Sequence, residues 1–430
     1  MSRRILIAGG GYVGLYAALV LQDKVKRDVE ITLVSPESYM TYQPFLPEAA
    51  AGSLEPRHVV VPLRRVLPKV RVVNGSVARV DHQSRVATIE PLQGPAYEVG
   101  YDEIVVSVGS VARTLPIPGL ADGAVGFKTI EEAIFLRNQV LECLDVAASA
   151  DEATRREQLT FVFVGAGYAG IEAMAELEDL ARYACRYYPT VEPADMRWVM
   201  VDAADRILPE LSPGLAAYTV RQLESRGIEV FTSTRLESAV DNRIVLSNGQ
   251  SFPAATLVWT AGVKANPVVN ALGMPLDERG RIDADEFLRV RGVDGAWTAG
   301  DCAGVPDLAN GGFCAPTAQH AVRQARRLGN NLAAHLDGQP PTAYRHKNVG
   351  SVASLGLYKG VAEVYGIRLR GFPAWFMHRT YHVSRVPTFN RKVRVLLDWT
   401  TALFFRREVV SLGALHRPRA AFEKSNVRLP

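Results

Sequence analysis

Apolar residues follow the same order in two distant stretches of the chain. Residues 5–8 (Ile-Leu-Ile-Ala) form a short apolar run, and an apolar segment follows after a glycine-rich turn. Residues 159–164 (Leu-Thr-Phe-Val-Phe-Val) begin a second succession of the same kind. A short apolar run before a turn is typical of a buried parallel strand, and the longer segment is long enough for a helix. The pattern therefore predicts an α/β protein with two copies of a strand–turn–helix unit.

Glycines occur at the same spacing, G-x-G-x-x-G, in both turns. They are Gly9, Gly11 and Gly14 in the first copy and Gly165, Gly167 and Gly170 in the second. The first glycine makes a tight turn, the second lets the backbone approach a pyrophosphate, and the third lets helix and strand pack closely. The helix that follows offers free N–H groups to the phosphates. One such motif is a weak signal, but two copies between a strand and a helix predict two dinucleotide sites.

The end of the next strand distinguishes the two sites. After the first copy, the position that is usually acidic is Ser35, and Glu37 follows two residues later. Either Glu37 reaches back to a ribose, or the Ser35 hydroxyl and the backbone hold it. After the second copy the strand ends on Asp202, which suits a ribose 2′-hydroxyl and would repel a 2′-phosphate. The sequence therefore favours NADH over NADPH at the second site, although Arg206 lies close in the sequence.

Three further buried strands are predicted to end near these sites. One ends in a turn at Gly109 and another in a turn at Gly262. The third, residues 297–301, delivers Asp301, whose carboxylate would accept hydrogen bonds from a polyol such as the ribityl chain of FAD. As an alternative, Asp301 only caps a helix. Two dinucleotides in one chain are most simply explained by hydride exchange between FAD and NAD(P)H.

Turn residues predict several local features. Asn74-Gly75 and residues 82–85 predict turns within a small meander over residues 70–89. Residues 39–51, which are aromatic and proline-rich, predict a loop that leads into a short helix.

Chain length, cysteine content and the length of the apolar runs narrow the class of protein. A chain of 430 residues is too long for one core, so two or three domains are expected. The four cysteines are too widely spaced for a disulfide framework or a zinc site. We therefore expect a reducing compartment and no metal. No apolar run reaches the roughly 18–20 residues of a membrane-spanning helix.

Positive charge is concentrated in the C-terminal tail. Residues 366–430 carry 13 Lys/Arg against 3 Asp/Glu, whereas the rest of the chain carries 36 against 42. Apolar side chains recur there at helical spacing, at Val393, Leu396, Leu397, Leu403 and Phe404. A short apolar helix with basic ends is typical of a helix lying in a membrane surface, and a docked core helix or a homodimer contact is the alternative. No recognition module accompanies the arginines, so no nucleic-acid partner is expected.

The order of these motifs resembles one family of flavoproteins. Besides the two glycine turns, the resemblance rests on residues 42–47 (Tyr-Gln-Pro-Phe-Leu-Pro), 206–209 (Arg-Ile-Leu-Pro), 299–303 (Ala-Gly-Asp-Cys-Ala) and 315–321 (Ala-Pro-Thr-Ala-Gln-His-Ala). These stretches look like type II NADH dehydrogenases, the single-chain NADH:quinone oxidoreductases of the superfamily with two dinucleotide-binding domains. The likeness in motifs covers residues 1 to about 335. The tail resembles the family only in its general character and not in any specific motif.

The resemblance implies a fold of two Rossmann-like domains, the NAD domain inserted in the FAD domain, and a C-terminal membrane-associating region. The implied division is 1–115 for the first part of the FAD domain, 116–265 for the NAD(H) domain, 266–340 for the second part of the FAD domain, and 341–430 for a C-terminal membrane-anchoring or dimerisation region.

The resemblance also implies roles for individual residues. FAD would bind at Gly9, Gly11, Gly14, Gly109 and Asp301, with Ser35 or Glu37 at its ribose, and NADH at Gly165, Gly167, Gly170, Asp202 and Gly262. The pair Ala318-Gln319 would lie where the flavin ring meets the quinone. Glu172 would lie near the nicotinamide and flavin, where a carboxylate could relay protons. Glu172 and Gln319 are thus the expected catalytic residues. The alternatives are that Glu172 only stabilises its own helix and that the side chain of Gln319 only caps a helix.

The implied activity is FAD-dependent NADH:quinone oxidoreduction without proton pumping. Hydride would pass from NADH to FAD in a ping-pong reaction, and two electrons would then pass to menaquinone or ubiquinone at the cytoplasmic face of the cell membrane. A sulfide:quinone oxidoreductase is the first alternative, but it needs a pair of cysteines at the flavin. A soluble NAD(P)H:acceptor flavin reductase and a flavin-bearing redox sensor are the others.

Overall fold

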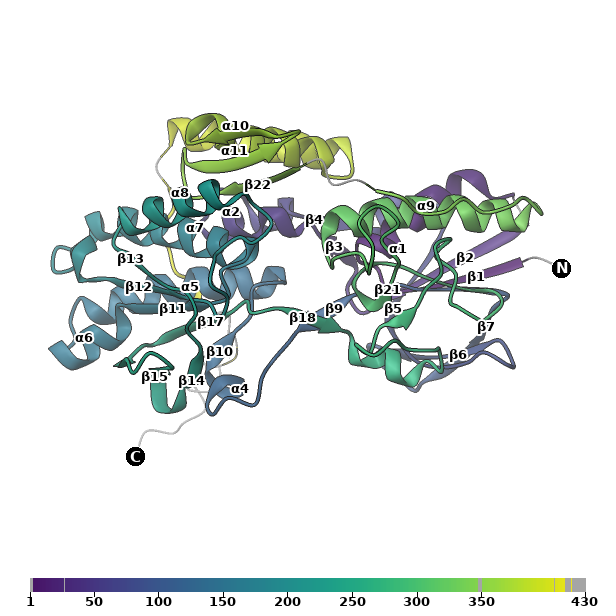
Figure 1. Ribbon diagram of the computed structural model, residues 1–430, viewed down its shortest axis with the longest axis horizontal. Coiled ribbons are helices and arrows are strands. Elements are labelled where there is room, and N and C mark those ends of the chain that lie inside the picture. Colours follow the sequence, from purple (N-terminus) through teal and green to yellow (C-terminus); the bar gives the residue numbers. More distant parts are fainter. Residues whose placement is uncertain (1–2, 27, 347–349, 406, 414–418, 420–430) are drawn as a thin grey trace. The chain divides into compact units, whose positions relative to one another are not determined.

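The computed structural model describes residues 3–26, 28–346, 350–405, 407–413 and 419, and it divides into two compact units (Figure 1). Unit 1 consists of Met1–Thr41, Val60–Arg113 and Val263–Asn348. Unit 2 consists of Tyr42–Val59, Thr114–Gly262 and Val349–Pro430. Each unit contains its own sheet with parallel strands around the glycine loop, as the two copies of the strand–turn–helix pattern predict.

Unit 1 is built on a seven-stranded sheet of order β20-β8-β1-β2-β5-β6-β7. The strands are β1 (Arg3–Ala8), β2 (Val29–Ser35), β5 (Arg71–Asp81), β6 (Val86–Pro91), β7 (Tyr97–Gly100), β8 (Glu103–Val106) and β20 (Ala296–Thr298). The five strands from β20 to β5 pair in parallel, so their carboxyl ends lie along one edge of the sheet. Residues 5–8 of β1 are buried, as expected of an apolar run inside a parallel sheet.

Two long helices, α1 (Tyr12–Lys24) and α9 (Ala318–Leu336), pack against each other in unit 1. A Cβ at Gly329 would lie 2.9 Å from the Cβ of Val20 and 3.1 Å from the carbonyl oxygen of Ala17, so this glycine lets the helices approach closely. The shorter elements of the unit are β3 (Tyr39–Thr41), β4 (Val60–Pro62), α3 (Leu63–Val66), β9 (Ser110–Ala112), β18 (Val263–Ala265), η6 (Pro267–Ala271), β19 (Ile282–Asp283), η7 (Gly300–Cys302) and β21 (Ala303–Gly304).

The turn expected at Asn74-Gly75 is not formed, because β5 runs unbroken through both residues. As far as Asn74 the strand pairs in parallel with β2, and from Gly75 onward it pairs antiparallel with β6. A Cβ at Gly75 would lie 2.5 Å from the carbonyl oxygen of Glu90 in β6. Glycine is needed here because a second strand approaches closely, and not because the chain reverses. The turn expected over residues 82–85 is present.

Unit 2 is built on a five-stranded parallel sheet of order β10-β17-β11-β12-β13. The strands are β10 (Ala124–Val125), β11 (Thr160–Val164), β12 (Arg197–Val201), β13 (Ile228–Phe231) and β17 (Thr256–Trp259). Its helices and turns include α4 (Leu120–Gly123), α5 (Ile130–Ala147), α6 (Glu152–Gln158), α7 (Tyr168–Ala184), η3 (Cys185–Tyr187), η4 (Pro193–Asp195), α8 (Pro213–Glu224) and η5 (Val240–Asn242). A small antiparallel sheet joins β14 (Leu236–Ser238), β15 (Arg243–Leu246) and β16 (Ser251–Pro253).

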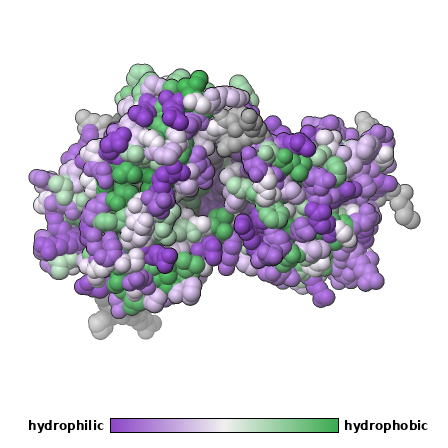
Figure 2. Space-filling view, viewed as in Figure 1, coloured by the Kyte–Doolittle hydropathy of each residue, from purple (hydrophilic) through white to green (hydrophobic). Residues whose placement is uncertain are grey.

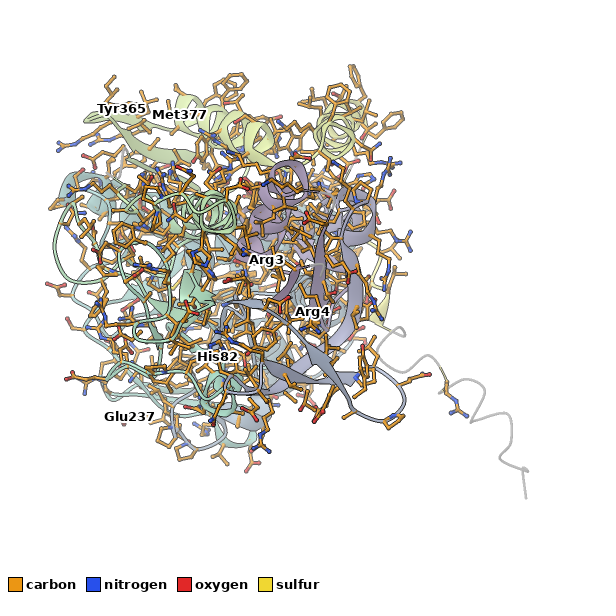
Figure 3. The ribbon with its side chains drawn as sticks, turned by 90° about the vertical axis from the view of Figure 1, so that its right-hand side faces the viewer. Arg3, Arg4, His82, Glu237, Tyr365 and Met377 are labelled. Atoms are coloured by element: carbon orange, nitrogen blue, oxygen red, sulfur yellow. The ribbon has the colours of Figure 1, made fainter. Side chains whose placement is uncertain are left out.

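The C-terminal segment forms a layer of its own in unit 2. An antiparallel sheet of β22 (Gly350–Ser354), β23 (Gly360–Val364) and β24 (Ile367–Arg370) packs against α10 (Phe372–Arg385), and α11 (Phe389–Phe404) follows. Figure 2 shows hydrophobic side chains among hydrophilic ones over the layer that contains α10 and α11. Tyr365, labelled in Figure 3, lies at the turn between β23 and β24, and its side chain is exposed. Among the described residues, no helix combines the length and the apolar character that crossing a bilayer requires.

The division differs from the expected one at residues 42–59, which cluster with unit 2. This segment contains the expected short helix, α2 (Leu46–Ala50), and two further helical turns, η1 (Gln43–Phe45) and η2 (Pro56–His58). The ring of Phe45 lies 5.7 Å from that of Trp399 in α11, and the hydroxyl of Tyr42 donates to the carbonyl oxygen of His382 in α10. The segment thus packs against the C-terminal helices. The assignment of the units to FAD and NAD(H) stays a prediction.

Candidate dinucleotide sites

The first glycine loop joins β1 to α1 in unit 1. Gly9 has a φ of 104°, which favours glycine, and a Cβ there would collide with the carbonyl oxygen of Ser107. A Cβ at Gly14 would collide with the carbonyl oxygen of Gly9, so the third glycine brings helix and strand together. At Gly11, by contrast, no atom lies within 4 Å of the Cβ position. The loop is open at its second glycine, where the motif accommodates a pyrophosphate.

Ser107 fixes this loop, although the sequence pattern did not point to it. Its hydroxyl oxygen lies 2.9 Å from the carbonyl oxygen of Ala8 and 3.2 Å from that of Gly9. Its backbone N–H also donates to Ala8, because β8 and β1 are neighbours in the sheet. Ser107 therefore holds the tight turn in place from the adjacent strand.

Ser35 and Glu37 lie at and beyond the end of β2. Ser35 is buried, and a Cβ on Gly10 would lie 2.7 Å from its Oγ. The backbone of Gly10 therefore packs directly on the Ser35 side chain, and a residue larger than glycine would not fit at position 10 without a shift. Glu37 is exposed. Which of the two residues holds a ribose stays a prediction.

Asp301 lies in η7, directly after the carboxyl end of β20. The hydroxyl of Ser110 donates to its Oδ2 at 2.6 Å. In the same turn, the N–H of Gly300 donates to Oε1 of the buried Gln324 at 2.8 Å. Gly109 has a φ of 68°, so the turn after β8 also requires a left-handed residue. Asp301 thus lies in a polar turn that Gly300 ties to α9, and its role toward a polyol stays a prediction.

Ala318 and Gln319 form the first turn of α9, which Thr317 caps. A Cβ at Gly300 would lie 3.9 Å from the Cβ of Ala321, so this turn of α9 lies beside the turn that carries Asp301. Both Ala318 and Gln319 are half-buried. Their expected role beside a flavin and a quinone stays a prediction.

The second glycine loop, between β11 and α7 in unit 2, repeats the geometry of the first. Gly165 has a φ of 111°, and a Cβ at Gly170 would collide with its carbonyl oxygen. No atom lies within 4 Å of the Cβ position at Gly167. The second loop is therefore open at the same point as the first.

Thr260 holds the second loop as Ser107 holds the first. Its hydroxyl oxygen lies 3.0 Å from the carbonyl oxygen of Val164 and 2.8 Å from that of Gly165. Each hydroxyl residue stands two positions before a left-handed glycine, which in this copy is Gly262 with a φ of 90°. The internal repeat therefore extends beyond the glycine motif, and this shared spacing is the signal that could have revealed both residues.

Asp202 follows β12 and is held against the second loop. Its Oδ2 accepts a hydrogen bond from the N–H of Ala166 at 2.5 Å, and its Oδ1 accepts one from the N–H of Ala204 at 2.8 Å. The guanidinium of Arg206 donates to the carbonyl oxygen of Pro209 at 2.7 Å. A carboxylate is thus fixed beside the second loop, where the first has a buried serine.

Glu172 of α7 points into a buried polar cluster. Its Oε1 accepts a hydrogen bond from the N–H of Ser354 at 2.8 Å and lies 3.0 Å from Nε2 of His378. Burial alone would lower the pKa of His378, but the adjacent carboxylate of Glu172, with the charges of Glu48 and Glu176, outweighs it and raises that pKa. The carboxylate therefore joins α7 to β22 and α10, which a role in starting α7 does not explain. Its expected place near the nicotinamide and flavin stays a prediction.

Glu176, one turn further along α7, lies in the same cluster. Its Oε1 accepts a hydrogen bond from the Ser354 hydroxyl at 3.0 Å, while its buried Oε2 has no hydrogen-bond partner among the described residues. Burial, followed by the charges of Glu48 and Asp179, raises the pKa of Glu176 to about 7. The protonated, neutral form of Glu176 suits this buried position, where its Oε2 has no partner among the described residues.

Glu48 of α2 is a third buried carboxylate, and it binds both C-terminal helices. Arg379 donates to its Oε2 at 2.8 Å, and the indole N–H of Trp399 donates to the same atom at 2.6 Å. The guanidinium of Arg379 also lies over the rings of Trp375 and Trp399, 4.2 and 4.7 Å from their centroids. The segment that carries the Tyr-Gln-Pro-Phe-Leu-Pro motif is thus linked to α10 by a buried ion pair and to α11 by a hydrogen bond.

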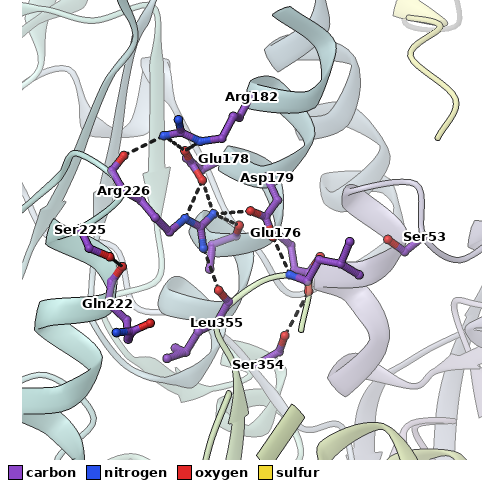
Figure 4. Close-up of polar contacts among 12 residues, drawn as sticks. Ser53, Glu176, Glu178, Asp179, Arg182, Gln222, Ser225, Arg226, Ser354 and Leu355 are labelled. Atoms are coloured by element: carbon purple, nitrogen blue, oxygen red, sulfur yellow. Dashed lines mark hydrogen bonds and ion pairs between the residues drawn. The ribbon is translucent and has the colours of Figure 1, made fainter. Parts of the chain in front are cut away.

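Arg226 connects α7 to the turn between β22 and β23 (Figure 4). It forms ion pairs with the fully buried Glu178 and with Asp179. Its Nη1 donates to the carbonyl oxygen of Leu355 at 2.7 Å. Removing one partner of such a network leaves a buried charge uncompensated, so the C-terminal layer is firmly attached within unit 2.

A known protein family covers most of the chain. The family described as "Pyridine nucleotide-disulphide oxidoreductase" matches residues 3–325. The chain belongs to this family.

Individual relatives narrow the resemblance. A type II NADH:quinone oxidoreductase of Staphylococcus haemolyticus is 30% identical over 390 residues, which cover 89% of this chain and 95% of that protein. A probable NADH dehydrogenase of Dictyostelium discoideum is 29% identical over 420 residues, or 95% of this chain and 91% of the relative. The structure of NDH2 from Plasmodium falciparum in complex with NADH matches with a TM-score of 0.89 at 17% identity, covering 95% of this chain and 100% of that one. The resemblance to type II NADH dehydrogenases and the α/β fold class are confirmed, and the protein is an oxidoreductase.

The cysteines of this oxidoreductase form no disulfide, although the family description names one. All four, Cys143, Cys185, Cys302 and Cys314, are free and buried. In unit 1, burial raises the pKa of both Cys302 and Cys314 to about 11, so both thiols stay protonated at neutral pH. In the described part of the chain, no group of three His, Cys, Asp or Glu side chains is placed to hold a metal ion.

Proposed function

We propose that the protein is a FAD-dependent NADH:quinone oxidoreductase that works by a ping-pong mechanism and does not pump protons. The observation that carries the proposal is the pair of glycine loops with the same geometry and different acidic residues. Asp301 stands at the edge of the sheet that carries the first loop, and Asp202 is bonded to the second. The relatives named as type II NADH:quinone oxidoreductases support the same activity.

FAD fits the first loop. Gly11 leaves room for a pyrophosphate, the N-terminus of α1 offers N–H groups, and Asp301 offers a carboxylate to a polyol. In this proposal Gly9, Gly14 and Gly109 shape the backbone around the cofactor. When bound, FAD supplies the two-electron chemistry that links a nicotinamide to a quinone.

NADH fits the second loop. Gly167 leaves the same open space, while Gly165, Gly170 and Gly262 shape the turns around it. The Asp202 carboxylate, fixed by the N–H of the loop, would accept a hydrogen bond from a ribose 2′-hydroxyl and repel a 2′-phosphate. This supports NADH as the donor in preference to NADPH.

The net reaction is NADH + H⁺ + quinone → NAD⁺ + quinol, so one proton is taken from water. In the ping-pong order, NAD⁺ leaves before the quinone is reduced. Glu172 and His378 are our candidates to hold this proton, because they form a buried pair in which the carboxylate raises the pKa of the imidazole. Gln319 is our candidate contact to the quinone. Glu172→Gln should slow quinone reduction by about 100-fold while bound flavin is still reduced by NADH.

We place the protein at the cytoplasmic face of the cell membrane, with the C-terminal layer in contact with lipid. On α11 the side chains of Phe389 and Phe404 are 81% and 79% exposed, and on α10 that of Phe376 is 56% exposed. Arg394 of α11 is exposed as well, and such apolar and basic positions favour an anionic membrane surface. A bilayer is also the source of a lipid-soluble quinone.

Co-sedimentation with vesicles tests this attachment. The double variant Phe389→Ser/Phe404→Ser should bind vesicles at least about tenfold more weakly, because each ring loses apolar burial. Leu92→Ser, at an exposed apolar position of unit 1, is the control and should bind as the wild type does. Equal binding by the double variant would refute the proposed contact.

The rival activity, sulfide oxidation, is less well supported. It needs a reactive pair of cysteines, whereas Cys302 and Cys314 are buried and hydrogen-bonded to the carbonyl oxygens of Val106 and Pro306. Sulfide is itself the nucleophile and would have to attack a cysteine disulfide, whereas both of these thiols are free.

The visible absorbance of bound flavin provides the test. Without oxygen, NADH should bleach the band rapidly, and a short-chain menaquinone analogue should restore it. Steady-state double-reciprocal plots at several quinone concentrations should be parallel, as ping-pong kinetics require. Bleaching by sulfide but not by NADH would refute the proposed activity, and intersecting lines would refute the ping-pong order.

A further inference from the structure

An arginine-lined hollow lies on the outer face of α9 in unit 1, apart from the first turn of that helix. Its volume is about 210 Å³, and its lining residues are Arg323, Arg326, Arg327, Asn330, Tyr344 and Arg345. Arg326 and Arg327 lie three and four residues after Arg323, and Asn330 follows them by four and three, so all four lie on one side of α9 over two turns.

The arginines of this hollow form no ion pairs within the described part of the chain, and the nearby Asp307 is not part of its lining. None of the described lining residues is an Asp or Glu. Other arginines of unit 1 do have partners, such as Arg281 with Asp277 and Arg289 with Asp285. Like charges at these helical spacings destabilise a helix. An anion in the hollow would remove this cost.

Parts of the wall are held in place without an anion. Tyr344 is 4% exposed, and its hydroxyl lies 3.0 Å from Nδ1 of His320. The guanidinium of Arg326 lies over the ring of Tyr16, 5.3 Å from its centroid. A guanidinium group fixed in this way binds an oxyanion with little loss of side-chain freedom.

The size and the chemistry of the lining identify the class of ligand. A hollow of about 210 Å³ is smaller than the ~300–1,000 Å³ of a typical small-molecule pocket. Arginine forms bidentate hydrogen bonds with phosphate oxygens. We propose that this hollow is a binding site for a phosphate ester group, supplied by an anionic phospholipid headgroup or by a soluble phosphate monoester. The site is independent of the proposed oxidoreductase activity, because binding requires no turnover.

Calorimetry on the purified full-length protein tests the site with three probes. These are dihexanoyl-phosphatidylglycerol and dihexanoyl-phosphatidylcholine, both below their micelle concentrations, and glycerol 3-phosphate. The wild type should bind at least one of the two net-anionic probes and should bind phosphatidylcholine more weakly. The double variant Arg327→Gln/Arg345→Gln should lose about tenfold or more in affinity, since each arginine makes charge-assisted hydrogen bonds.

The matched control is Arg65→Gln/Arg71→Gln, which removes two exposed arginines elsewhere in unit 1. This variant has the same net charge as the first and should bind as the wild type does. Tighter binding of phosphatidylglycerol would identify the lipid headgroup as the source, and tighter binding of glycerol 3-phosphate would identify the soluble ester. The proposal is overturned if neither anion binds, if phosphatidylcholine binds equally well, or if both double variants lose affinity equally.

A second readout uses only the wild-type protein. His346 contacts His320 ring to ring, and its buried Nε2 has no hydrogen-bond partner among the described residues. Burial, then the charges of Arg323 and His320, lower the pKa of His346, and the charge of Asp307 offsets only part of this. A bound phosphate would offset more of the positive charge, so the pKa of His346 measured by NMR should rise when the anion is added. An unchanged pKa at saturating probe would contradict the site.

Discussion

The two glycine loops have the same geometry but different surroundings. In each, the first glycine is left-handed, the second leaves open space, and a hydroxyl residue of the neighbouring strand fixes the turn. In unit 1 the following strand ends on Ser35, which packs against Gly10. In unit 2 it ends on Asp202, which accepts a hydrogen bond from Ala166. The motif therefore gives the two loops the same shape, and in our proposal the end of the next strand selects the nucleotide.

The helices that follow the loops differ as well. Helix α1 is apolar and packs against α9 through close contacts at Gly329. Helix α7 instead carries a row of buried acids: Glu172 and Glu176 bind Ser354 of the C-terminal layer, and Glu178 pairs with Arg226. The comparison shows how one repeated unit acquired two different packing partners through the outward face of its helix.

The largest effect is expected where the two copies are alike. Gly14→Ala and Gly170→Ala should each destabilise their own unit by about 3 kcal/mol or more, because the new Cβ collides with a backbone oxygen. Gly214→Ala, at an uncrowded helical position, is the control and should be neutral or stabilising. Amide hydrogen exchange measured by mass spectrometry would report each unit separately. Unchanged protection in both loop variants would contradict the shared geometry.

Asp202→Ala tests the main difference between the loops. The variant should raise the KM for NADH by about tenfold or more, because the ribose loses an acceptor and the Ala166 N–H loses its partner. The KM for NADPH should change much less, since the repulsion of a 2′-phosphate is removed. Asp205→Ala, an exposed acid of the same turn, serves as control and should leave both values unchanged. An equal rise for both nucleotides would refute a selective role.

Glu176→Gln tests the buried acids of α7 through pH. The folded protein raises the pKa of Glu176 from 4.5 to about 7, so folding binds a proton in this range. This contribution to stability is present below about pH 4.5 and is lost as the pH rises through about 7. Urea unfolding of unit 2 between about pH 5 and pH 8 should therefore show a smaller loss of stability in the variant.

The control for this measurement is Glu237→Gln, which replaces an exposed acid of the same unit, labelled in Figure 3. Its pH dependence should match that of the wild type. If the stability of Glu176→Gln falls with pH as steeply as that of the wild type, a group other than Glu176 causes the pH dependence.

The smallest effect is expected at the two hydroxyl residues. Ser107→Ala and Thr260→Val should each cost about 1 kcal/mol, because each removes one hydrogen bond to a loop carbonyl group. Hydrogen exchange should become faster in the first loop for one variant and in the second loop for the other. Destabilisations that differ severalfold would mean that Ser107 and Thr260 do not hold their loops equivalently.

Patterns within the sequence predicted those parts of the molecule that local chemistry determines. Apolar runs before G-x-G-x-x-G turns correctly gave β1, β11 and the two loops, because buried strands and left-handed glycines have strong sequence signals. The turn predicted at Asn74-Gly75 was wrong. In the sequence, a glycine that allows two strands to approach closely cannot be distinguished from a glycine in a turn.

Contacts between residues far apart in the chain could not be predicted from the sequence. The pair of Glu172 and His378 joins residues more than two hundred positions apart. Glu48 lies in a segment that was expected to be a loop and a short helix, yet it binds Arg379 and Trp399 at the other end of the chain. Burial determines these partners, and no local spacing encodes them.

The central claim is that the two loops bind different nucleotides, and the most direct test is the flavin content of two matched variants. Gly11 and Gly167 have φ values of −72° and −77°, and a Cβ at either meets no protein atom, so alanine should leave the fold intact. The account predicts that purified Gly11→Ala loses its FAD, whereas Gly167→Ala keeps its FAD and is bleached by NADH only at much higher concentration. Loss of FAD from Gly167→Ala, or full retention by Gly11→Ala, would contradict the assignment.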